Sequence, residues 1–156
     1  QEARGETRAK AERIMMRRIG LAALSYLVPT FVLGFVWHLI LFKNQYDALE
    51  IYRRDVIIPF GLLSMLIQAV FFAWVFDRSF GNSGASPVKR GLVFAGFGAA
   101  LSWSFTTIAV AAKNVMTSVP DYLLIETAFT LAQWAIVGPL MALAHAKAAK
   151  RTHSFA

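Results

Sequence analysis

The chain has 156 residues, of which 57% are hydrophobic, and it carries a net charge of +7. Its mean hydropathy of +0.52 lies above that of an ordinary soluble domain. The sequence has no cysteine, which excludes disulfides, thiolate metal sites and thiol nucleophiles. The basic residues lie mostly outside the apolar runs, so membrane topology accounts for the positive charge better than nucleic-acid binding does.

Four apolar runs are separated by charged or turn-rich segments. Each has about 20 or more residues, enough for a helix to cross the roughly 30 Å hydrocarbon core. Because backbone groups find no water in that core, runs of this kind must be helical. The sequence therefore predicts an all-α integral membrane four-helix bundle within residues 19–146, with spans at 19–42, 56–76, 91–112 and 122–146.

Lysine and arginine are unevenly divided between the two sides that these spans define. Twelve of the 16 lie on one side, in the basic N-terminal segment 1–18, the loop after the second span and the basic tail 147–156. The other side carries Lys43, Arg53, Arg54 and Lys113. The positive-inside rule then places both termini in the cytoplasm.

The first span contains one ionisable residue, His38, in the stretch FVWHLILFK near its outer end. The following segment, KNQYDALEIYRRD, lacks glycine and proline, and Tyr46, Leu49 and Tyr52 recur at helical spacing. This pattern favours an interfacial helix over 44–54 with its tyrosines at headgroup depth. An ordinary loop is the alternative.

The loop DRSFGNSGASPVKR (77–90), after the second span, is rich in Gly, Ser and Pro and is expected to be a flexible cytoplasmic connector. In the third span, small residues at spacings of three or four predict a face that packs against other helices: Gly91, Ala95, Gly98, Ser102 and Thr106. A ligand groove along that face is the alternative. The opposite face, toward lipid or a partner chain, is expected to hold Phe94, Phe97, Leu101 and Phe105.

The fourth span contains Glu126 about one turn inside its outer boundary, which is also the depth of His38. If the first and fourth helices are neighbours, these two residues form a polar pair or ligand site. Alternatively, each reaches the outer headgroups separately, and Glu126 is also favoured by the dipole at the start of its helix. Ionisable residues inside spans are functional candidates by default.

Two amides and two tryptophans lie deep in the spans. Gln68 and Gln133 are each expected to hydrogen-bond a neighbouring helix, because an unpaired amide in hydrocarbon is costly. Trp103 and Trp134 lie away from the interfacial belt that tryptophan usually prefers. They either line an apolar pocket or fill the core.

The sequence contains little that indicates catalysis or cofactor binding. His38 and His145 lie near opposite faces, so they cannot serve as the two axial ligands of one haem. Single-His haem or pigment ligation at His38 stays open. A cluster of metal ligands, a Ser–His–Asp arrangement, a P-loop and a G-x-G-x-x-G motif are all absent. We therefore predict no catalytic residue, no metal site and no cofactor, and nothing supports an enzyme.

Three stretches carry a resemblance that covers about residues 19–146. GFVWHLILF closes the first span, IIPFG opens the second and TLAQWAIVGPLMAL lies late in the fourth. In these stretches the chain resembles small four-helix bacterial inner-membrane proteins of uncharacterised families. The resemblance implies a bacterial inner (cytoplasmic) membrane location and carries over no catalytic residue. Small drug-exporting four-helix proteins differ, because they depend on a glutamate in the first helix.

Three functional hypotheses follow. The first is a non-enzymatic polytopic membrane protein that is an accessory or structural subunit of a larger assembly, or a homo-oligomer, in contact with lipids and a protein partner but not nucleic acid. The second is a small transporter or channel that uses His38 and Glu126 as proton- or substrate-linked groups. The third is a binder of a lipophilic ligand (a quinone, a pigment or a lipid) at Trp103 and Trp134.

Overall fold

The structure is a computed structural model that describes residues 2–53, 55–81 and 84–153, and within them the chain is helical and contains no strand. Two π-helical turns, η1 and η2, interrupt otherwise α-helical segments. In chain order the elements are α1 (Glu2–Val36), η1 (Trp37–Leu41), α2 (Lys43–Leu49), α3 (Ile58–Ser79), α4 (Pro87–Ser102), η2 (Trp103–Ile108), α5 (Ala109–Lys113) and α6 (Val119–His153).

Four helical stretches are long and apolar enough to cross a membrane. Each corresponds to one of the four apolar runs, so the predicted all-helical fold with four candidate spans is confirmed. The stretches are Arg4–Leu41, Ile58–Ser79, Pro87–Lys113 and Val119–Ala149. The first extends well before residue 19, because the polar N-terminal segment continues α1 as a helix.

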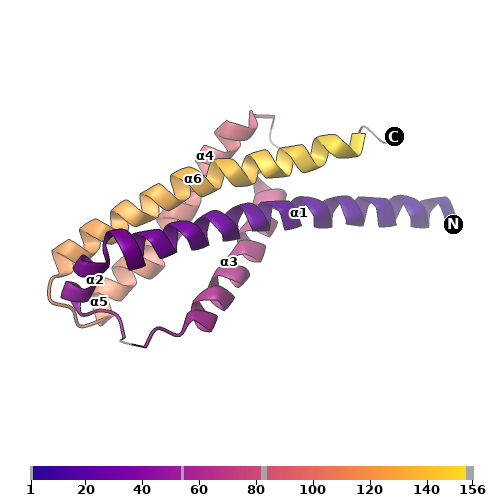
Figure 1. Cartoon of the computed structure of the whole chain (residues 1–156). Coiled ribbons are helices and arrows are strands. Elements are labelled where there is room, and N and C mark those ends of the chain that lie inside the picture. The colour runs from indigo at the N-terminus through magenta and orange to yellow at the C-terminus, as the bar shows by residue number, and fades with distance from the viewer. Residues whose placement is uncertain (1, 54, 82–83, 154–156) are drawn as a thin grey trace.

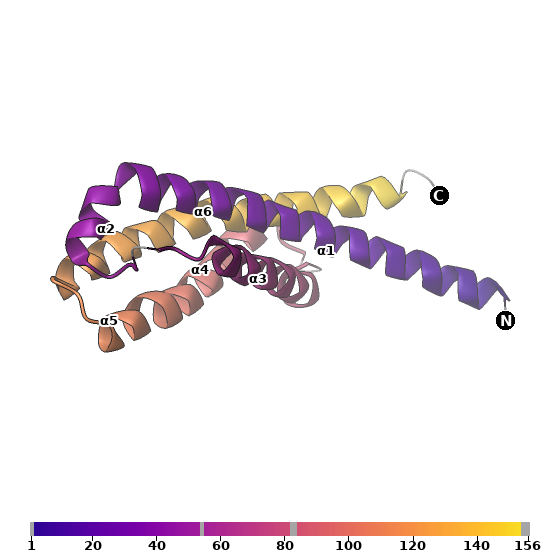
Figure 2. The same cartoon turned by 60° about the horizontal axis from the view of Figure 1, so that its bottom comes forward.

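Helix α6 is the centre of the bundle. It packs along α1 on one side and along α4 on the other, while α3 packs mainly on α1 (Figure 1). Both ends of the chain lie at one end of the molecule, and α2 and α5 lie at the opposite end, as both views show (Figures 1 and 2). Residues from α1, α2 and α6 therefore meet at the end away from the termini.

Small residues allow α4 and α6 to approach closely. Gly91, Ala95 and Gly98 are buried at this contact. A Cβ added at Gly91 would lie 2.7 Å from the Cα of Pro139, and one added at Gly98 would overlap the indole ring of Trp134. A side chain at either position would therefore push the two helices apart.

The third span departs from the predicted faces at Phe94 and Thr106, and Leu101, predicted to face outward, is partly buried against the core. Phe94 was expected to face outward, but it is fully buried, because α3 covers that side of α4 with aromatic rings. Phe97 and Phe105 are exposed as expected. Thr106 was expected in the packing face but is exposed, and its neighbour Thr107 is fully buried instead. The wider turn of η2 changes which residue faces inward.

The core between the helices is aromatic. Phe72 and Phe94 make edge-on contacts with Trp134, at ring-centroid distances of 4.9 and 5.7 Å. Trp134 is buried and donates its indole N–H to Ser102 at 2.9 Å. Trp103 lies outside this core, 40% exposed, and donates to Thr127. The two tryptophans therefore do not line one pocket.

Both deep amides bond to neighbouring helices. Gln68 on α3 accepts a hydrogen bond from the hydroxyl of Tyr26 on α1 at 2.7 Å. Gln133 on α6 donates to the hydroxyl of Thr30 on α1 at 3.2 Å. Helix α1 is thus linked by polar contacts to α3 and to α6 near the middle of the bundle.

Candidate functional site

His38 and Glu126 meet at the end of the bundle away from the termini. The Nε2 atom of His38, in η1, lies 3.3 Å from Oε1 of Glu126, in α6. The side chains are 18% and 10% exposed, respectively. The common depth inferred from the sequence and the side-by-side packing of α1 and α6 therefore bring these residues into contact.

The backbone around His38 explains how its ring is held. In η1 the amide of Phe42 donates to the carbonyl of Trp37, five residues back, so the helix is widened at this turn. The Nδ1 atom of His38 lies 2.9 Å from the carbonyl oxygen of Gly34, one turn earlier. This contact fixes the ring and leaves Nε2 facing Glu126.

The two contacts of the imidazole determine how many protons the pair can hold. A carbonyl oxygen can only accept, so Nδ1 carries a hydrogen that it donates to Gly34. One further proton then fits between Nε2 and Oε1 of Glu126. It belongs either to an imidazolium facing a carboxylate or to a carboxylic acid facing a neutral imidazole. The pair is therefore built to share one proton.

Tyr46 on α2 supplies a third member of the site. Its hydroxyl donates to the same Oε1 atom of Glu126 at 2.6 Å, and the residue is 1% exposed. Burial, followed by the neighbouring carboxyl of Glu126, raises the pKa of Tyr46 far above its ordinary value. The phenol therefore keeps its proton over the physiological range and acts as a donor.

The helix that follows the first span is shorter than the sequence predicts. The helix covers 43–49 rather than 44–54, because Glu50 adopts a left-handed conformation with φ of 55° and ends it. The side chain of Tyr46 turns inward and contacts Glu126. Thr117, before α6, holds α2 in place by donating from its hydroxyl to the carbonyl of Ala48 at 2.7 Å.

Aromatic rings enclose the pair. The ring of His38 contacts Phe129 edge-on at 4.5 Å and Tyr46 at 4.7 Å, measured between centroids. Tyr52 stacks on Tyr46, with the two ring centroids 5.1 Å apart. Rings that exclude water from a polar cluster lower the local dielectric and so strengthen each hydrogen bond within it.

The chain matches no protein-family model, no curated protein and no solved structure. The candidate site therefore rests on geometry.

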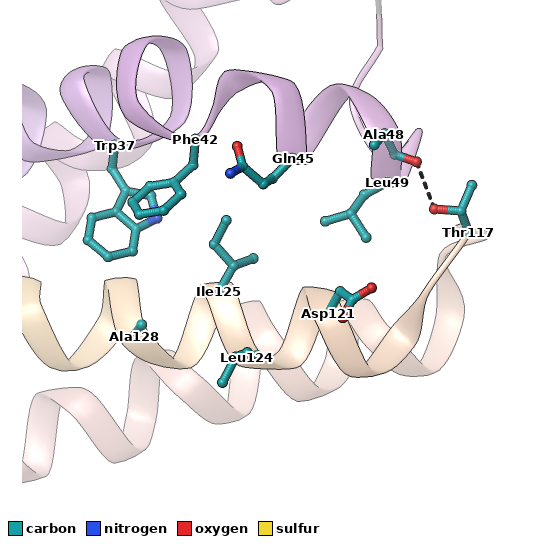
Figure 3. Close-up of a pocket in the computed structure, with 10 residues that line it drawn as sticks. All are labelled: Trp37, Phe42, Gln45, Ala48, Leu49, Thr117, Asp121, Leu124, Ile125 and Ala128. Carbon is teal, nitrogen blue, oxygen red and sulfur yellow. Dashed lines mark hydrogen bonds between the residues drawn. The ribbon is translucent and has the colours of Figure 1, made fainter.

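An apolar cavity of about 450 Å³ lies beside the cluster, between α2 and α6 (Figure 3). The hydrogen bond from Thr117 to Ala48 crosses one end of it. Its lining differs from the apolar pocket expected at Trp103 and Trp134, since neither tryptophan takes part. The lining residues are Trp37, Phe42, Gln45, Ala48, Leu49, Thr117, Asp121, Leu124, Ile125 and Ala128.

Ligation of haem or pigment by His38 meets an obstacle in this geometry, because both of its ring nitrogens already face oxygen atoms. An axial ligand needs a free nitrogen lone pair, so ligation would require one of these contacts to break. In the described part of the chain, no group of three or more His, Cys, Asp or Glu side chains is placed to hold a metal ion.

Sequence reasoning missed a second histidine–carboxylate pair. Asp77 was assigned to the flexible connector, but α3 continues through Ser79, and Oδ1 of Asp77 lies 2.7 Å from Nε2 of His145 on α6. His145 is 2% exposed. The sequence does contain an indication of this pair. The second and fourth spans end at the same depth, which is the argument that paired His38 with Glu126.

Proposed function

We propose that the chain is a small proton-linked membrane transporter whose proton-binding site is the cluster of His38, Glu126 and Tyr46. The observation that supports this is the 3.3 Å contact between Nε2 of His38 and Oε1 of Glu126, both largely buried. Ionisable groups at membrane depth are costly and usually mark ion or substrate pathways.

The cluster has the properties that reversible proton binding needs. The two acid–base groups share one proton, and either can hold it. Tyr46 stays a donor to Oε1, so the carboxyl keeps one hydrogen bond in both states. A proton that arrives or leaves therefore changes the charges in the cluster without leaving Glu126 unpartnered, which suits repeated loading and release.

Proton flux in proteoliposomes tests this proposal. The parent chain is expected to carry protons down a pH gradient, read by a trapped pH dye, faster than empty liposomes. His38→Ala and Glu126→Gln are each expected to slow this flux about tenfold or more, because neither variant can share the proton.

Asp47→Asn is the matched control, because it also changes an acid to its amide at this end of the molecule. Asp47 is exposed and paired with Lys43 on α2, so its loss should leave the flux unchanged. Equal flux in the parent, His38→Ala and Glu126→Gln would overturn the proposal.

The orientation that we propose places both termini in the cytoplasm and the proton site toward the outer face of a bacterial inner membrane. The distribution of Lys and Arg supports it, and so does the common position of the two termini at one end of the bundle (Figure 1). A C-terminal reporter that is active only outside the cytoplasm should therefore be silent, and an active reporter would reverse the assignment.

A specific feature of α3 favours a second candidate, a subunit of a larger membrane assembly or a homo-oligomer. The first half of α3 leaves the bundle and exposes bulky apolar side chains, among them Phe60 (68% exposed), Ile58 (64%) and Ile67 (62%).

We expect native mass analysis in mild detergent to give an oligomer or a complex, which Phe60→Ala and Ile67→Ala should weaken. Leu124→Ala, at an exposed apolar residue of α6, should not weaken it. A strictly monomeric parent would contradict this candidate.

A further inference from the structure

The pair of Asp77 and His145 lies at the other end of α6 from the first cluster. His145 follows Glu126 by 19 residues on the same helix, which is about 28 Å of rise at 1.5 Å per residue. That distance is close to the roughly 30 Å thickness of the hydrocarbon core. If α6 spans a membrane, each pair therefore lies near a different surface.

The contacts of His145 favour one proton arrangement. Nε2 faces Asp77 at 2.7 Å, whereas Nδ1 is buried and has no hydrogen-bond partner among the described residues. A buried N–H without an acceptor is costly, so Nδ1 is expected to carry a bare lone pair while Nε2–H donates to Asp77. His38 has the opposite arrangement, since its Nδ1 donates to Gly34.

The surroundings of His145 are tight and include the side chain of Arg90. Gly81 packs against the imidazole, since a Cβ added there would lie 2.9 Å from Cε1. Arg90 on α4 donates to the carbonyl of Gly81. A second proton at His145, on Nδ1, therefore needs an acceptor that enters the site.

The space between the two pairs is polar at one end and apolar at the other. From Glu126 inward, α6 presents buried Thr130 and then Gln133, which bonds Thr30. Beyond them the interior is filled by fully or largely buried apolar side chains: Phe72, Phe76, Phe94, Trp134, Met141 and Ala142. Phe76 contacts the imidazole of His145 edge-on at 5.3 Å. The aromatic cluster thus separates His145 from the polar half.

We propose that Asp77 and His145 form a second proton-binding site, which exchanges protons with the surface on the side of the chain termini, opposite the surface served by His38 and Glu126. This inference rests on the proposed transport function. The structure then corresponds to a closed state, in which the aromatic cluster keeps the two sites apart. A proton crosses only when that cluster moves and an acceptor for Nδ1 of His145 enters.

Flux measurements with the full chain in proteoliposomes test this inference. Asp77→Asn and His145→Gln are each expected to lower proton flux about tenfold or more, the same effect that is expected of Glu126→Gln. Asp77→Glu, which keeps the carboxylate, should retain more flux than Asp77→Asn. Asp55→Asn, at an exposed acid paired with Arg53, is the control and should behave as the parent.

The outcomes separate the two proposals. If Glu126→Gln loses flux while Asp77→Asn and His145→Gln keep it, the second site is wrong and the transport function stands. A parent that carries no more protons than empty liposomes overturns both.

A measurement on the parent alone avoids variants that fail to fold. Nitrogen NMR of the ¹⁵N-histidine-labelled chain should show a buried histidine protonated at Nε2 and bare at Nδ1, distinct from one protonated at Nδ1. If no histidine signal shows protonation at Nε2 with a bare Nδ1, the arrangement proposed for Asp77 and His145 is wrong.

Discussion

Gly98→Ala is expected to lower the stability of the bundle by about 1–3 kcal/mol, the usual range for overpacking a tight contact. The added Cβ would overlap the ring of Trp134, which is 1% exposed and held by its hydrogen bond to Ser102. The ring cannot move aside without disturbing Phe72 and Phe94, which contact it. Reversible unfolding in detergent, followed by circular dichroism, measures the loss.

Gly96→Ala is the matched control, because it makes the same chemical change two residues away. A Cβ at Gly96 would meet no heavy atom within 4 Å, and the residue is exposed. Alanine has a higher helix propensity than glycine by about 1 kcal/mol, so this variant should be as stable as the parent or more stable. If both variants change stability equally, packing between α4 and α6 does not limit stability at Gly98.

The contact between His38 and Glu126 shows what the depth of residues within their spans can predict and what it cannot. Span boundaries follow from hydropathy, and boundaries give depth, because every residue advances a helix by the same rise. Residues at one depth become partners only if their helices are neighbours. Nothing in a single sequence states which helices touch, and here α1 and α6 happen to lie side by side.

Asp77 lies at the boundary between the second span and the loop after it, where residue depth does not predict its environment. The sequence assigns it to a connector because glycine, serine and proline follow it closely. The helix nevertheless continues past it to Ser79, since Asp77 finds a buried partner in His145. A carboxylate at the end of an apolar run is compatible with either environment, and only the tertiary contact decides between them.

Local backbone changes account for the other differences. Helix α2 ends after about two turns at Glu50, which adopts a left-handed conformation although the sequence has no glycine there to indicate it. Thr107 replaces Thr106 inside the bundle because η2 widens the helix. Such π-helical turns depend on tertiary packing and leave no regular pattern in a sequence.

Glu126→Leu is expected to cost about 3–5 kcal/mol of stability, because it breaks a buried polar cluster by removing the member that the others share. The variant leaves Nε2 of His38 and the hydroxyl of Tyr46 without their partner. Leucine has a similar volume and suits an apolar site, so the loss reports mainly on the two orphaned groups. Unfolding of the reconstituted chain is the measurement.

The double variant Tyr46→Phe with Glu126→Leu separates the cluster from simple burial. Tyr46→Phe alone should be destabilising, since it removes the 2.6 Å bond to Oε1. In the Glu126→Leu variant, Tyr46→Phe removes a hydroxyl that already lacks its partner, so it should leave stability unchanged or raise it. The loss of stability in the double variant should therefore be smaller than the sum of the two single losses by about 1–3 kcal/mol. Additive losses would mean that Tyr46 and Glu126 contribute independently, and the cluster would then be a coincidence of packing rather than one hydrogen-bonded unit.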